Sequence, residues 1–89
     1  MIYLITYTIS KNRDYTPLYD AIKNSGTWWH YIDSSWIVKS DDTANTIFQR
    51  LKPLIDQKDD YLLVIKVDPS SRQGWLPRKA WDWFRNNSN

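Results

Sequence analysis

Hydrophobic residues in this chain fall into short runs and helical stripes separated by polar breaks. Two runs, 2–9 (IYLITYTI) and 61–67 (YLLVIKV), are rich in β-branched and aromatic residues, which is typical of β-strands. Two shorter runs, 28–32 and 36–39, flank the polar stretch 33–35 (Asp-Ser-Ser), which favours a turn. The pattern therefore predicts four strands, with a hairpin in the middle of the chain.

Two segments between these strands carry the spacing of amphipathic helices. Thr16 followed by Pro17 predicts a helix start, with threonine as the N-cap and proline at the first helical position. The stripe within 44–55 is the clearest amphipathic signal in the chain, and we expect Asp41 or Asp42 to cap it. Each predicted helix connects two predicted strands.

The order of elements predicts an α+β fold of the ferredoxin-like type. A βαββαβ order places four antiparallel strands in one sheet with both helices on one face. Because the chain has 89 residues, it has room for one hydrophobic core. We expect residues 1–68 to form this core domain and residues 69–89 to form a tail with a short helix that begins near Pro77.

Both faces of the predicted sheet are apolar. In the first strand Ile2 and Leu4 lie on one side, and Tyr3, Ile5, Tyr7 and Ile9 lie on the other. Since the two helices cover one face, the tail or a second copy of the chain must cover the other, and a face-to-face homodimer is the simplest arrangement. The residues expected in tail or dimer packing are Tyr3, Ile5, Tyr7, Trp75, Trp81 and Trp83.

The composition changes this picture mainly by exclusion. The chain has six tryptophans, one histidine and no cysteine, which excludes disulfides, thiol nucleophiles and zinc sites built on thiolates. No apolar run approaches the roughly 18 residues of a membrane span and no signal peptide is apparent, so we expect a cytoplasmic protein.

Charge gives one weak indication of a partner. The net charge of +2 is too small to predict nucleic-acid binding by itself, but basic residues concentrate in the tail. A two-fold axis would double this set into a broader patch that DNA or RNA can contact. The candidate nucleic-acid contacts are Lys11, Arg13, Arg72, Arg78, Lys79 and Arg85.

Three motifs carry a resemblance to a known group of proteins. Residues 28–38 (WWHYIDSSWIV), 51–53 (LKP) and 74–77 (GWLP) are similar to short bacterial and phage proteins described as SinR-like. More broadly, the chain resembles the small ferredoxin-like nuclease superfamily. That superfamily includes the small subunit of the CRISPR adaptation machinery and the virulence-associated protein D ribonucleases.

The resemblance implies a specific metal site, and the sequence departs from it. In the nucleases the first strand ends in Tyr-Asp, and one such aspartate from each of two subunits is thought to hold a divalent cation. The matching residues here are Tyr7 and Thr8, and a neutral threonine is a poor magnesium ligand. We therefore expect no metal, no cofactor and no nuclease chemistry, unless Asp14 or Asp33 supplies the missing carboxylate and Mg²⁺ binds there.

Three functions remain open at this point. The first is a non-catalytic, homodimeric relative of these nucleases that binds nucleic acid. The second is an active Mg²⁺-dependent nuclease or ribonuclease toxin. The third is a small interaction or ligand-sequestering protein whose tryptophans hold a protein or a nucleotide.

Two aromatic features have both a functional and a structural interpretation. His30 has no partner in the sequence that suggests a general base, so we interpret it as a structural residue. Tyr3 and Tyr7 occupy positions where RNA-recognition motifs stack bases. The glycine-flanked aromatic signature of those motifs is missing, which favours packing over stacking.

Overall fold

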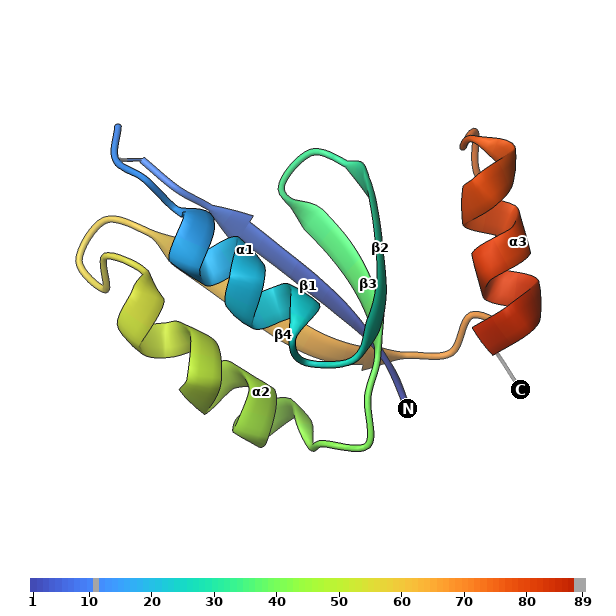
Figure 1. Ribbon diagram of the computed structural model, residues 1–89, viewed down its shortest axis with the longest axis horizontal. Coiled ribbons are helices and arrows are strands. Elements are labelled where there is room, and N and C mark those ends of the chain that lie inside the picture. The colour runs from blue at the N-terminus through green and yellow to red at the C-terminus, as the bar shows by residue number, and fades with distance from the viewer. Residues whose placement is uncertain (11, 88–89) are drawn as a thin grey trace.

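The computed structural model describes residues 1–10 and 12–87. Its elements are β1 (Ile2–Thr8), α1 (Thr16–Lys23), β2 (Thr27–Ile32), β3 (Ser35–Lys39), α2 (Ala44–Leu51), the 3₁₀ turn η1 (Lys52–Leu54), β4 (Tyr61–Val67) and α3 (Arg78–Asn87). The four strands form one antiparallel sheet in the order β2-β3-β1-β4. This is the α+β, ferredoxin-like arrangement that the sequence predicts, with an additional C-terminal helix (Figure 1). No helix among the described residues is long and apolar enough to cross a membrane.

Both helices between strands begin differently from the prediction. Thr16 is already helical, and its N–H donates to Asp14 Oδ1 at 2.9 Å. The N-cap of α2 is Thr43, whose Oγ1 accepts the N–H of Thr46 at 3.1 Å. The predicted cap Asp42 instead forms an ion pair with Arg50 on α2. Several cap-forming residues stand next to one another here, and sequence alone does not select among them.

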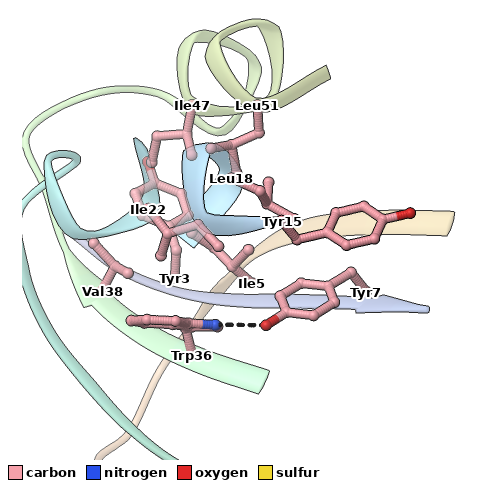
Figure 2. Packing of buried hydrophobic residues seen from close by; sticks show 10 residues of the cluster. All are labelled: Tyr3, Ile5, Tyr7, Tyr15, Leu18, Ile22, Trp36, Val38, Ile47 and Leu51. Atoms are coloured by element: carbon pink, nitrogen blue, oxygen red, sulfur yellow. Dashed lines mark hydrogen bonds between the residues drawn. The ribbon is translucent and has the colours of Figure 1, made fainter. Parts of the chain in front are cut away.

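One face of the sheet packs against α1 and α2 and contains the larger core (Figure 2). Its buried residues are Tyr3, Ile5, Tyr7, Tyr15, Leu18, Ile22, Trp36, Val38, Ile47 and Leu51. Trp36 is 2% exposed, and its Nε1 donates to Tyr7 Oη at 3.1 Å.

This core corrects one expectation from the sequence. The sequence predicts tail or dimer packing for Tyr3, Ile5 and Tyr7, but these side chains lie beneath α1 and α2. In an antiparallel pair, residues directly opposite each other point to the same face. Ile5 lies opposite Trp36, so the odd-numbered side chains of β1 share the helix-covered face. The even-numbered side chains, such as Ile2, face the other way.

The other face of the sheet carries a smaller cluster beneath α3. Ile2, Trp29 and Ile37 from the sheet are buried together with Ala80 and Phe84 from α3. Trp81 and Trp83 pack against this cluster, whereas Trp75, in the segment between β4 and α3, is fully exposed. The tail helix therefore covers part of its own sheet, on the β2 side (Figure 1).

The β4 side of this second face is open. Tyr61, Leu63 and Ile65 are 75%, 49% and 45% exposed. They lie opposite Thr8, Thr6 and Leu4 of β1, which places all of them on the face away from α1 and α2. We call these three exposed side chains the β4 strip.

Candidate nucleic-acid interface

The solvent-facing side of α3 is cationic. Ala80 and Phe84 point into the sheet, which leaves Arg78, Lys79 and Arg85 exposed. Arg85 forms an ion pair with Asp82, one turn earlier on the helix. Three basic side chains against one carboxylate give this short helix a net positive surface, which we call the α3 cationic face.

The remaining basic candidates are not part of this face. The Arg72 guanidinium lies 5.1 Å from the centre of the Phe84 ring, and its Nη1 donates to the carbonyl of Pro69. Arg13 lies over the ring of Tyr15, in the loop before α1, and this loop is at the opposite end of the molecule from α3 (Figure 1). Lys11 lies outside the described residues. The structure thus brings together Arg78, Lys79 and Arg85, with Arg72 serving in packing.

The position of the nuclease aspartate contains no carboxylate. Thr8 is exposed at the end of β1, beside a shallow pocket of about 190 Å³. The pocket is lined by Thr6, Tyr7, Thr8, Tyr61, Leu62 and Leu63. Hydroxyl groups and aliphatic side chains offer a divalent cation only neutral ligands.

The two alternative carboxylates lie elsewhere. Asp14 lies two residues before α1, and hydrogen bonds from Thr16 lower the pKa of its carboxyl group. Asp33 lies in the β2–β3 turn, and neither residue lines the pocket at Thr8. Among residues 1–10 and 12–87, no group of three or more His, Asp or Glu side chains is placed to hold a metal ion.

A cluster of aromatic and basic side chains lies where α1 meets β2. The His30 ring stacks on Trp36, with centroids 3.8 Å apart and an interplanar angle of 13°. Trp28 contacts the same indole at 5.3 Å, and Tyr19 of α1 stacks on it at 6.3 Å. Lys23 Nζ lies 5.3 Å from the centre of the Trp28 ring. We call these five residues the aromatic rim.

His30 fits its structural interpretation in this cluster. Partial burial lowers its pKa below the usual value, while the nearby carboxylate of Asp33 acts in the opposite direction. The neutral ring can then stack flat on Trp36. The rim could not be predicted from the sequence, because its residues lie close together only after α1 packs beside β2. The sequence did contain one indication. Tyr19 and Lys23 are spaced to share one face of a helix, and Trp28 and His30 are spaced to share one face of a strand.

Asp60 is a second residue whose role the sequence does not reveal, because it stands within a charged loop. It is buried, and its carboxylate accepts hydrogen bonds from Tyr15 Oη at 2.8 Å and from the N–H of Ser10 at 2.9 Å. Burial acts to raise the pKa of Asp60, but hydrogen bonds from Ser10, Asp56 and Tyr15 outweigh it and lower the pKa to about 2. The residue ties the loop before β4 to the loop after β1.

A polar pocket of about 490 Å³ lies at the start of α2. It is lined by Ser25, Gly26, Thr27, Lys39, Ser40, Asp41, Asp42 and Asn87. A Cβ on Gly26 would lie 1.9 Å from the carbonyl oxygen of Lys39, so glycine is required for this close approach. The ion pair between Asp42 and Arg50 satisfies the charge of one lining carboxylate.

Two indole N–H groups are buried where α3 meets the sheet. Nε1 of Trp29 and Nε1 of Trp83 are buried, and neither makes a hydrogen bond within the part of the chain that the structure describes. Leaving a buried donor unpaired typically costs about 1–3 kcal/mol. The contact between α3 and the sheet is therefore weaker than its aromatic content suggests.

Function has to be inferred from these residues and contacts. The chain matches no protein-family model and no curated protein.

Proposed function

We propose that the chain is a non-catalytic, homodimeric relative of the small ferredoxin-like metal-dependent nucleases and that it binds nucleic acid. The observation that carries the proposal is the α3 cationic face, where Arg78, Lys79 and Arg85 are exposed together. Basic side chains bind phosphates and release the counterions condensed on nucleic acid, which makes binding favourable at low salt.

The end of β1 supports the non-catalytic part of the proposal. The nucleases need a carboxylate there to hold a divalent cation, and this chain has Thr8 in a pocket with neutral lining residues. Without a bound cation, no group at this position polarises a phosphate or activates a water molecule.

The β4 strip supports the homodimer. β4 is an edge strand, and the side chains on its open face (Tyr61, Leu63, Ile65 and Val67) carry no charge. Exposed edge strands of monomers usually carry charges or prolines that prevent association. A two-fold axis places one neutral strip against another without charge repulsion, and it brings two α3 cationic faces into one particle.

The experiment is a salt titration of binding, read by fluorescence anisotropy of a labelled oligonucleotide. The double variant Arg78→Gln/Lys79→Gln should weaken binding and reduce the salt slope by about 0.9 for each phosphate that it no longer neutralises. The matched control is Lys58→Gln/Lys66→Gln, which removes the same charge at two exposed positions outside α3 and should keep most of the slope.

Two results would contradict the proposal. Affinity that does not change with salt, or no binding to DNA or RNA at all, would exclude the α3 cationic face as a phosphate site. Strand cleavage that requires Mg²⁺ and is abolished in Asp14→Asn or Asp33→Asn would show an active nuclease.

A further inference from the structure

The aromatic rim is held rigidly by the core of the protein. Trp36, at its centre, is buried, and its indole N–H is fixed by Tyr7 Oη. His30 and Trp28 project from alternate positions of β2 onto this indole, while Tyr19 reaches it from α1. The outer rings are therefore pre-positioned and need not be ordered when a ligand binds.

The outer part of the rim is exposed to solvent. Trp28 is 39% exposed although it contacts two other side chains, and His30 is also exposed. The Lys23 ammonium lies over the Trp28 ring, 5.3 Å from its centre, and a partly exposed indole beside a cation is a suitable surface for a planar ligand.

We propose that the aromatic rim stacks the unpaired bases of a single-stranded nucleic acid. This inference rests on the proposed function and adds the substrate class to it. Every base presents a π-face, so Trp28 and His30 can stack on a strand without regard to its sequence. A duplex hides these faces between its own base pairs, so the rim favours single strands.

The α3 cationic face lies on the other side of β2 from the rim. β2 lies between α1 and α3, and Trp29 of β2 contacts Phe84 of α3 edge-on at 5.8 Å (Figure 1). The α3 cationic face therefore borders β2 on the side away from α1. Trp28 and His30 lie on the α1 face of the sheet and α3 on the other, so a strand that stacks on the rim reaches Arg78 or Arg85 only by passing around the edge strand β2.

The rim itself is not strongly basic. Base stacking at the rim can therefore be distinguished from phosphate attraction at the α3 cationic face. Asp20 on α1 and Asp33 in the β2–β3 turn accompany Lys23, so phosphate attraction at the rim is weak. Stacking, which does not depend on net charge, is what the rim contributes.

The test compares a short single-stranded oligonucleotide with a duplex of the same length. Trp28→Ala should weaken single-strand binding about 5- to 150-fold, the range for removal of one stacking side chain, and should leave duplex binding unchanged. Trp75→Ala is the matched control: it removes a fully exposed indole outside the rim and should change neither affinity. If Trp28→Ala does not fold, Trp28→Leu keeps apolar contact with Trp36 and removes the ring face.

The outcomes separate this inference from the function on which it rests. Equal affinity of the wild-type protein for single strand and duplex, or equal weakening in Trp28→Ala and Trp75→Ala, would overturn the stacking site and leave the α3 cationic face in place. If the wild-type protein binds neither oligonucleotide, both proposals fail.

Discussion

The two faces of the sheet are closed to different degrees. The face under α1 and α2 is packed continuously, and the indole N–H of Trp36 has its partner in Tyr7. The face under α3 is covered only on the β2 side, leaves the indole N–H groups of Trp29 and Trp83 without hydrogen bonds among the described residues, and exposes the β4 strip. The first face therefore contains the larger core, and the second leaves apolar side chains exposed beside β4.

The sequences of the two covering layers explain this difference. α1 and α2 each bury two aliphatic side chains, such as Leu18 and Ile22, against large aromatics of the sheet. On α3 the buried residues are Ala80 and Phe84. Trp81 and Trp83 are partly buried against this cluster, and the buried Nε1 of Trp83 makes no hydrogen bond among the described residues.

Trp36→Ala should have the largest effect on stability. It removes a buried indole from the well-packed face and leaves the Tyr7 hydroxyl without its donor, so we expect the free energy of unfolding to fall by about 3–5 kcal/mol. Urea denaturation measures it, with Trp75→Ala as the control that should stay within about 0.5 kcal/mol of the wild type. A decrease below about 1 kcal/mol would show that this face is not the principal core.

Phe84→Ala should have a smaller global effect and a larger local one. Truncation weakens the anchor of α3, and this helix can detach while the rest of the sheet stays folded. Hydrogen exchange should show faster exchange of α3 amides with little change in β1 and β3. Equal acceleration throughout the chain would mean that both faces unfold as one unit.

Lowering the pH should remove the contribution of Asp60 to stability. Its pKa is about 2 in the folded protein, against an ordinary value of 3.8, so its ionised form stabilises the fold above pH 3.8 and this contribution disappears as pH falls toward 2. The stability difference between the wild type and Asp60→Asn should therefore shrink over this interval. A difference that is constant with pH would contradict the role assigned to the carboxylate.

Leu63→Lys should leave monomer stability nearly unchanged and prevent the proposed dimer from forming. Leu63 is half-exposed on the β4 strip, so its replacement removes little from the core, but a two-fold axis would bring two lysines together. Light scattering after gel filtration should show a dimer for the wild type and a monomer for the variant. A monomeric wild type would mean that the β4 strip is not a self-association surface.

Much of the fold follows from the sequence because each pattern there is local. The β-branched and aromatic runs and the stripe in 44–55 give the element order, and the element order indicates the sheet topology. The sequence also indicates that both faces of β1 are apolar. It does not indicate which face the helices cover, since Ile2 and Leu4 are as apolar as Tyr3 and Ile5. The packing of α1 and α2 against Ile5 and Trp36 decides that question.

Less of the candidate sites than of the fold could be predicted from the sequence. The basic residues of the tail could be identified, because three of them lie close together on one helix. Arg13 and Arg72 could not be separated from them, since their packing on Tyr15 and Phe84 depends on tertiary contacts. The aromatic rim combines residues from two elements around one buried tryptophan, and no local pattern describes it.

The measurement that tests the central claim most directly is the affinity of the wild-type protein and of Arg78→Gln/Lys79→Gln for one labelled oligonucleotide over a range of salt concentrations. If the α3 cationic face binds phosphates, binding by the wild type should weaken steeply as salt increases, and the variant should show a shallower slope. Identical slopes for the two proteins, or no binding by the wild type at low salt, would contradict it.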